Sequence, residues 1–232
     1  MRKLLFYFVY ALMLPFSSWS QATKTDPTDA EGWYSASLKL DLPKKWETNL
    51  TYEARFYNNL KTYYGSFISL SGTKSVSKVV KLSGEYRVAL LEEGITHRYT
   101  LGMEATWKFK KKLELATRLQ IQNRIQDAYD PLEATDKTLF WRFRTQLKYP
   151  LHKDWDIYGS VEPIMEVGGD NFVDNWRNTL GFKYKGLKKT KIDLFYIYRP
   201  DYGKKTYNRL YHIIGLNVAY QLKVKSGKEK KK

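Results

Sequence analysis

The most regular feature of the chain is an alternation of apolar and polar residues between His97 and Arg124. A period of two is the side-chain period of a β-strand, because successive side chains point to opposite faces. Three lysines at residues 110–112 interrupt the alternation, so the stretch is predicted to form a hairpin. Its apolar face holds Tyr99, Leu101, Met103, Ala105, Trp107, Leu113, Leu115, Leu119 and Ile121, and its polar face holds Arg98, Thr100, Gly102, Glu104, Thr106, Glu114, Arg118, Gln120 and Gln122.

The same unit recurs along the chain, and short turns alternate with long loops. The pattern occurs at residues 33–42, 46–57, 63–74, 79–91, 97–109, 113–124, 139–148, 155–166, 175–185, 190–199 and 210–222. Long strands with one apolar face are typical of barrels that cross a bilayer, and bacterial single-chain barrels have even strand numbers. We therefore predict an all-β fold, a single transmembrane antiparallel up-and-down β-barrel of about 10 to 12 strands. Twelve strands are favoured, with the additional strand within the polar residues 21–32. Pro163 cannot donate to a ladder and predicts a bulge or an early end of its strand.

Alternation alone does not say which face points outward, since a soluble lipocalin-like barrel would place the apolar face inside. The number and length of the strands, and the Arg, Glu and Gln residues at consecutive polar positions, favour a lipid-facing apolar surface. Aromatic residues on that surface gather near both strand ends, as in the aromatic girdles of membrane barrels. They are Trp46, Trp107, Phe109, Tyr149, Trp155, Tyr184 and Tyr220 near short turns, and Tyr34, Phe56, Tyr86, Tyr99, Trp141, Trp176 and Tyr198 near long loops. The short turns are predicted to be periplasmic and the long loops extracellular.

The N-terminus has the pattern of a secretory signal peptide. Arg2 and Lys3 precede an apolar run over residues 4–16, and small residues follow at Ser18 and Ser20. A retained anchor is the alternative, but the run is shorter than the about 20 residues that span a bilayer. The predicted organisation is a signal peptide at 1–20, a polar arm at 21–32, the barrel at 33–222 and a basic tail at 223–232.

Export changes the interpretation of the net charge of +16, which would otherwise suggest nucleic acid as a partner. We predict the bacterial outer membrane as the location, with outer-membrane lipids and the barrel-assembly machinery as partners and no nucleic acid. The absence of cysteine removes disulfides, a lipoprotein anchor and thiolate metal sites. The oligomeric state is left open.

On the predicted inward face, arginines outnumber glutamates toward the long loops. Guanidinium groups bind carboxylate and phosphate oxygens through forked donors, so the excess predicts an anion-attracting lumen and, if the lumen is open, a narrow anion-leaning channel. The alternative is a closed plug of salt bridges, because charges in a narrow barrel are costly unless paired. The arginines are Arg55, Arg87, Arg98, Arg124, Arg142, Arg144, Arg177 and Arg199, and their acidic partners are Glu53, Glu85, Glu104 and Glu162.

An enzymatic role is the second hypothesis. Outer-membrane lipid hydrolases have a similar architecture and use serine and histidine on the outer wall, where His97 and His212 are predicted to lie. A nucleophile needs its base within hydrogen-bond reach, and Ser66 is two strands away from His97, which favours interfacial histidines. The histidines and the loop carboxylates lack metal-ligand spacing, so no metal or cofactor is predicted. Lysines cluster at the short turns, either as solvated turns or as a positive rim for anionic headgroups or cell-wall polymer.

Two patterns resemble known proteins. Gly215 followed by Val218, Tyr220 and Leu222 resembles the C-terminal assembly signal of outer-membrane barrels, although a basic tail follows it. The mature chain also resembles a family of short bacterial outer-membrane barrels known only as a domain of unknown function. The resemblance implies this fold and location, and no activity. Its residues are Trp33, Glu53, Arg55, Trp141, Arg142, Phe143, Arg144, Glu162, Pro163, Arg177, His212, Ile213, Ile214 and Gly215.

Overall fold

A computed structural model describes residues 28–92, 94–109, 112–128, 136–168, 173–202 and 209–224. The predicted signal peptide, residues 21–27 and residues 225–232 of the predicted tail lie outside these ranges. The strands are β1 (Thr28–Leu42), β2 (Trp46–Tyr57), β3 (Thr62–Ser75), β4 (Val80–Leu91), β5 (Gly94–Lys108), β6 (Glu114–Ala128), β7 (Asp136–His152), β8 (Trp155–Glu166), β9 (Asn175–Leu187), β10 (Thr190–Asp201) and β11 (Arg209–Lys223). A short 3-10 turn, η1 (Pro43–Lys45), joins β1 to β2.

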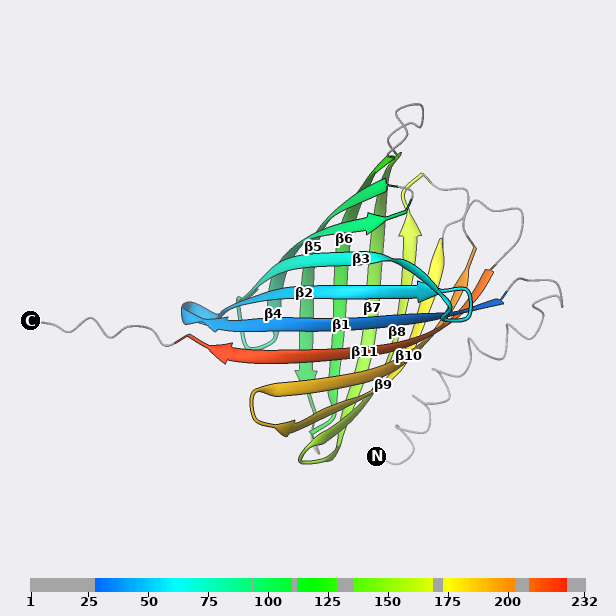
Figure 1. The fold of residues 1–232 in the computed structure, drawn as a ribbon. Coiled ribbons are helices and arrows are strands. Elements are labelled where there is room, and N and C mark those ends of the chain that lie inside the picture. Colours follow the sequence, from blue (N-terminus) through cyan, green and yellow to red (C-terminus); the bar gives the residue numbers. More distant parts are fainter. Residues whose placement is uncertain are drawn as a thin grey trace, which may run out of the picture.

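Each strand pairs with its neighbours along the chain, and β11 returns to β1 to close a barrel (Figure 1). Chain neighbours are antiparallel, whereas β1 and β11 pair in parallel from Thr28 opposite Leu210 to Asp41 opposite Lys223. Because an odd number of up-and-down strands leaves the first and last running in the same direction, eleven strands require this parallel seam. The predicted β-barrel is confirmed. The preference for twelve strands and for a wholly antiparallel sheet is wrong within the described residues.

The first strand begins earlier than predicted. Residues 28–32, expected in a polar arm, extend β1 and pair with residues 210–214 of β11. Their polar side chains have partners: the Asp29 carboxylate accepts the backbone N–H groups of Asn58 and Asn59 at 3.0 and 2.8 Å. Polarity therefore did not exclude a strand here, because backbone pairing with β11 and local hydrogen bonds satisfy these groups.

The strand that contains Pro163 neither ends nor shifts register at that residue. Pro163 stands opposite Trp176 of β9, and the pairs on either side, Glu162 with Arg177 and Ile164 with Asn175, keep the same register. The expected bulge or early end is thus wrong. A proline removes one N–H donor. On the β7 side the ladder has no pair at Phe143 or Arg144, and it resumes in the same register with Thr145 opposite Val161.

The alternation separates an outer apolar surface from a polar interior, as the sequence predicts. Leu101 of β5 is 67% exposed and Leu119 of β6 is 42% exposed, whereas Gln122 is 8% exposed. Exposed tyrosines, leucines and tryptophans recur on every strand at the outward positions. No helix within the described ranges is long and apolar enough to cross a membrane.

The connections that follow the odd-numbered strands are all short and lie at one end of the barrel, whereas the other end has the long loops together with the short β2–β3 and β4–β5 connections. In Figure 1, η1, the β9–β10 turn and the C-terminal end of β11 lie together at the left, and the N-terminal end of β1 points to the right. Lys44, Lys45, Lys112 and Lys189 occupy the left-handed region in these turns, with φ of 58°, 64°, 68° and 63°. The odd strand number therefore places the two ends of the barrel sequence at opposite ends of the barrel.

One sector of the interior is apolar. Trp33 of β1, Ile197 of β10 and Ile213 of β11 are buried against one another, and Phe195 and Tyr211 pack on them. Gly215 lies opposite Phe195, and a Cβ atom at residue 215 would stand only 2.0 Å from the Phe195 ring. The ring therefore occupies the space that the missing side chain leaves. This sector forms a wall against which the charged residues of the lumen are arranged.

Candidate functional site

A band of charged side chains encircles the lumen on the long-loop side of its middle. Its members come from inward positions of nine strands and combine guanidinium groups with a smaller number of carboxylates. We call this set the arginine belt: Arg55, Arg87, Arg98, Arg118, Arg142, Arg177 and Arg199, with Glu31, Glu53, Glu85 and Glu162.

Part of the belt is a chain of ion pairs across β2, β4 and β5. Arg55 lies 2.6 Å from Glu53, and Arg87 lies 3.6 Å from the same carboxylate. Arg98 lies 2.7 Å from Glu85, to which Arg87 contributes a longer contact of 3.9 Å. Each of the two acids therefore faces two guanidinium groups. The pair on β2 is completed by Arg87 from β4, two strands away, and the pair on β4 is completed by Arg98 from the neighbouring β5.

A second group centres on Glu162 of β8. Its Oε1 atom accepts hydrogen bonds from Arg118 of β6 at 2.9 Å and from Arg142 of β7 at 3.0 Å. Arg142 also donates to Gln122 Oε1 at 2.9 Å. Two guanidinium groups on one carboxylate leave this group with an excess of positive charge.

The third group surrounds Trp33. Its Nε1–H donates to Glu31 at 2.8 Å, and Glu31 also accepts a hydrogen bond from Arg199 at 2.9 Å. The guanidinium carbon of Arg55 lies 3.9 Å from the Trp33 ring centroid, and that of Arg177 lies 5.6 Å away. Cation–π attraction of this kind stabilises a guanidinium group without neutralising it.

Arg177 differs from the other members of the belt. It stands directly opposite Glu162 in the β8–β9 register, yet the Glu162 carboxylate pairs with Arg118 and Arg142. Within the described ranges no carboxylate lies within 4.0 Å of Arg177, and its Nε is buried without a hydrogen-bond partner. Among the described residues, the site thus holds one guanidinium group without a carboxylate in direct contact.

The belt borders a cavity of about 170 Å³, here called the arginine cavity. Six arginines and two glutamates line it, so the formal charge of its lining is six minus two, or +4. The lining residues are Trp33, Glu53, Arg55, Glu85, Arg87, Arg98, Thr100, Arg118, Gln120, Arg142 and Arg177.

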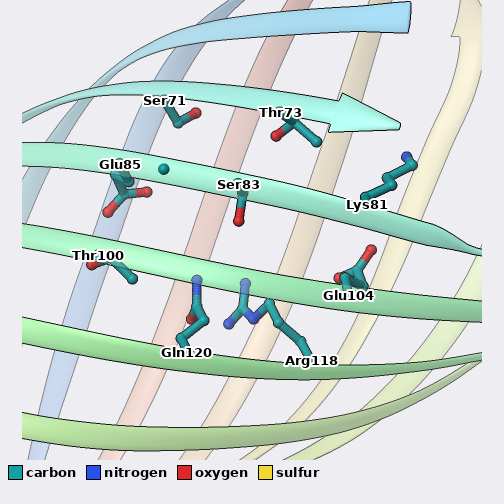
Figure 2. A pocket seen from close by; sticks show the side chains of 10 residues that line it. Ser71, Thr73, Lys81, Ser83, Glu85, Thr100, Glu104, Arg118 and Gln120 are labelled. Carbon is teal, nitrogen blue, oxygen red and sulfur yellow. The ribbon is translucent and has the colours of Figure 1, made fainter. Parts of the chain in front are cut away.

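A second cavity of about 180 Å³ adjoins it toward the short turns, and we call it the hydroxyl cavity (Figure 2). It shares Glu85, Thr100, Arg118 and Gln120 with the arginine cavity. The remaining lining is Ser71, Thr73, Lys81, Ser83, Gly84 and Glu104. The two cavities therefore form adjacent compartments along the β3–β6 wall.

Two of the arginines predicted from the sequence lie outside this arrangement. Arg144 pairs with Glu104 at 3.1 Å, and Arg124 contacts Thr138 at 3.5 Å and lies 5.5 Å from the Phe140 ring centroid. Neither arginine lines the two cavities. The other six predicted arginines belong to the belt.

Sequence reasoning missed four participants. Alternation predicts that Arg118 faces inward, although the predicted site lacks it. Glu31 falls in the predicted arm, and the sequence predicts no role in the site for Trp33 or Phe67. Phe67 lies beneath Arg55, with 4.1 Å between its ring centroid and the guanidinium carbon. Alternation put Trp33 on the inward face with Ser35 and Ser37, and this was the available signal.

Toward the short turns the lumenal charges change in kind. Lysine replaces arginine, and each of three lysines is close to an acid: Lys148 to Glu114 at 2.8 Å, Lys185 to Asp156 at 2.7 Å and Lys183 to Asp193 at 3.5 Å. The half of the lumen near the short turns is therefore closer to charge neutrality than the arginine belt.

At the long-loop end, the connection between β8 and β9 contains Asp174. Its carboxylate accepts a hydrogen bond from Asn175 Nδ2 at 2.6 Å. Burial raises the pKa of Asp174, and the nearby Asp201 adds to this effect.

The residues considered for hydrolysis have other partners. Ser66 bonds the hydroxyl groups of Tyr52 at 2.7 Å and Tyr63 at 2.6 Å. His97 Nδ1 bonds Tyr86 at 2.8 Å and His212 Nδ1 bonds Tyr196 at 2.6 Å, each pair stacked between adjacent strands. In the part of the chain that the structure describes, no three His, Asp or Glu side chains gather as metal ligands.

A closed barrel with an apolar outer surface and a charged interior defines the class of the protein, a small β-barrel built around a polar lumen. Residues 30–223 match the model of the family described as "Protein of unknown function (DUF2490)", and the chain belongs to this family. The family resemblance drawn from the sequence is therefore confirmed.

Two solved structures are similar to the chain. A NanC porin in a rhombohedral crystal form has 13% sequence identity, covers 73% of this chain and 86% of its own, and gives a TM-score of 0.49. OccK8 (OprE) of Pseudomonas aeruginosa has 11% identity, covers 68% of this chain and 54% of its own, and gives a TM-score of 0.34. No curated protein matches the sequence.

Proposed function

We propose that this protein is an outer-membrane barrel whose narrow lumen passes small anions in preference to cations. The observation that carries the proposal is the arginine cavity, which six arginines and only two glutamates line. Since the arginines project from β2, β4, β5, β6, β7 and β9, an ion in the lumen would pass close to several of them.

The outer surface supports the location. A continuous apolar surface of this extent is unfavourable in water and matches the hydrocarbon of a bilayer. Trp46, Trp107 and Trp155 are exposed near the short turns, and Tyr86 and Trp141 are exposed toward the other end, as interfacial girdles require. The N-terminal signal pattern supports export, and we include a Gram-negative outer membrane in the proposal.

Electrostatics supports anion preference. A low-dielectric wall focuses the field of the charges that line a narrow passage, which raises the local concentration of the opposite ion. Ion pairing with Glu53, Glu85 and Glu162 reduces this field, but Arg177 has no carboxylate partner within 4.0 Å in the described ranges. The remaining field is therefore positive.

A closed barrel stiffened by salt bridges is the second candidate. Ion pairs that skip a strand favour it: Arg118 of β6 reaches Glu162 of β8, and Arg144 of β7 reaches Glu104 of β5. Such pairs join strands that are not neighbours, on the lumen side of the strand between them. The plug and the channel differ in one measurable property, conductance.

The enzymatic alternative receives less support than either, since Ser66 bonds two tyrosines and each outward histidine bonds another tyrosine. A Ser66→Ala variant that lowered lipid hydrolysis by the purified barrel would revive it.

The deciding experiment is reconstitution of the full mature barrel in a planar bilayer under a potassium chloride gradient. We expect a reversal potential whose sign shows that chloride is more permeant than potassium. In the double variant Arg142→Gln/Arg177→Gln, the reversal potential should shift toward zero. A matched control is Lys137→Gln, which removes an outward-facing charge and should leave the reversal potential unchanged. Cation selectivity would overturn the proposal, and absence of conductance would favour the plug.

A further inference from the structure

The hydroxyl cavity has a chemical character that anion conduction does not explain. Ser71, Thr73, Ser83 and Thr100 present hydroxyl groups to it, and Gln120 presents an amide (Figure 2). Ser71 and Ser83 have only long hydrogen bonds to backbone oxygens, each of 3.5 Å. A simple conduit for chloride does not need such a lining.

Two polar atoms at the boundary of the cavities lack partners. Thr100 Oγ1 and Gln120 Oε1 are buried and make no hydrogen bond within the described structure, although both residues line both cavities. Buried polar atoms are nearly always hydrogen-bonded, so each exception calls for an explanation. An amide oxygen can only accept, and a fully ionised oxyanion cannot donate to it. A ligand hydroxyl group can donate a hydrogen bond to this oxygen.

The arginine cavity requires a different group. Its guanidinium groups converge from six strands, and Arg177 has no carboxylate partner in the described part of the chain. A planar carboxylate offers two oxygens in one plane. A phosphate offers oxygens in tetrahedral directions and a charge near −2, which suits donors that approach from several walls.

We propose that the two cavities together form one binding site for a small phosphorylated sugar or polyol, with its phosphate among the arginines and its hydroxyl groups against Thr100, Gln120, Ser71 and Ser83. The shared lining of the cavities is what joins the two subsites. The site rests on the proposed function in one respect, since the anion-attracting lumen is the route by which this ligand reaches it.

The test measures binding to the purified barrel in detergent, with glucose 6-phosphate, inorganic phosphate, glucose and glucuronate as probes. Intrinsic fluorescence reports the arginine cavity because Trp33 lines it, and the Trp33→Phe variant identifies that contribution. We expect glucose 6-phosphate to bind about tenfold more tightly than phosphate, and glucose and glucuronate to bind more weakly than either.

Three variants separate the subsites. Arg177→Gln should weaken both phosphate ligands about tenfold, because each loses charge-assisted hydrogen bonds. Gln120→Met keeps the size of the side chain but removes the acceptor, so it should weaken only glucose 6-phosphate. Arg124→Gln is the control, since it removes one lumenal charge that lines neither cavity and should change neither affinity beyond twofold.

Equal affinities for glucose 6-phosphate and phosphate, or an unchanged affinity in Arg177→Gln, would overturn the site. Tighter binding of glucuronate would assign the arginine cavity to carboxylates instead. These outcomes are independent of the selectivity measurement. An anion-selective barrel that binds no sugar phosphate would support the proposed function and contradict the binding site. A barrel that binds sugar phosphate but does not conduct would support the binding site and contradict the proposed function.

Discussion

Arg199 of β10 donates a hydrogen bond to Glu31 of β1 at 2.9 Å, so the pair joins the two strands that flank β11. Both side chains are mostly buried, with 14% and 13% of their surface exposed. Glu31 also accepts the indole N–H of Trp33. The pair therefore holds the parallel seam from the lumen side.

Removing one partner of this pair should destabilise the barrel. We expect Glu31→Gln to lower the free energy of unfolding by about 3 kcal/mol, because a buried guanidinium group would lose its counter-ion. Urea unfolding in phospholipid vesicles measures the change. The double variant Glu31→Gln/Arg199→Gln is the control and should lose less than the sum of the single variants, and additive losses would contradict the pairing.

The outer surface predicts a second contrast. Leu119→Arg places a charge on the lipid-facing side of β6 and should cost about 2–4 kcal/mol near the middle of the bilayer. Ser71→Arg places the same side chain in the hydroxyl cavity, opposite Glu85 in the β3–β4 register, and should cost far less. Equal losses in the same unfolding assay would mean that these faces are assigned wrongly.

Two glycines, Gly215 on the inner face and Gly72 on the outer face, allow a test of packing around a missing side chain. At Gly215 a Cβ atom would stand 2.0 Å from the Phe195 ring, whereas at Gly72 nothing lies within 4 Å of the corresponding position. Gly215→Val should therefore lower stability by about 3 kcal/mol through overpacking, and Gly72→Val should be nearly neutral. The variant Phe195→Ala should relieve much of the cost of Gly215→Val when the two are combined.

The odd strand number predicts where the ends of the barrel lie relative to the membrane. The chain contains no cysteine, so single-cysteine variants report one position each. With the short turns in the periplasm, a membrane-impermeant thiol reagent added to intact cells should label Thr28→Cys and Asn58→Cys. It should leave Lys189→Cys and Lys223→Cys unlabelled until the outer membrane is opened.

The reverse labelling pattern would show that the barrel has the opposite orientation in the membrane. Labelling of residues 28 and 223 from the same side would contradict an eleven-stranded barrel in the membrane. External protease provides a second check, and it should cut within residues 126–137 or 201–209 and spare residues 110–112.

Alternation was sufficient to predict the barrel and the two faces, because burial on one side of a strand leaves a period of two in the sequence. It did not reveal where β1 begins, since Asp29 and Glu31 are polar residues whose partners come from distant parts of the chain. It did mark eleven segments, and the preference for a twelfth strand came from the even strand number of bacterial single-chain barrels, which this barrel does not follow.

The arginine excess could likewise be predicted, but its pairing could not. Register places Glu162 opposite Arg177, yet the carboxylate binds Arg118 and Arg142. Long side chains choose among several neighbours inside a closed lumen, and one sequence does not encode that choice locally. Hence only the structure identifies Arg177 as a guanidinium group with no carboxylate within 4.0 Å in the described ranges.

The parallel seam between β1 and β11 also constrains how the barrel could have arisen and how it can be rearranged. Duplication of whole hairpins adds strands in twos, so it cannot by itself produce a barrel of eleven strands. Circular permutation, which joins the two original ends of the chain, is constrained by the same parallel seam. A strand of 15 residues is about 50 Å long, and a linker joining residue 28 to residue 223 would have to cross the full height of the barrel. Such a linker would have to pass through the arginine-lined interior or, in the proposed membrane, through hydrocarbon. In a barrel with an even number of strands both ends lie on the same side, and no such crossing is needed.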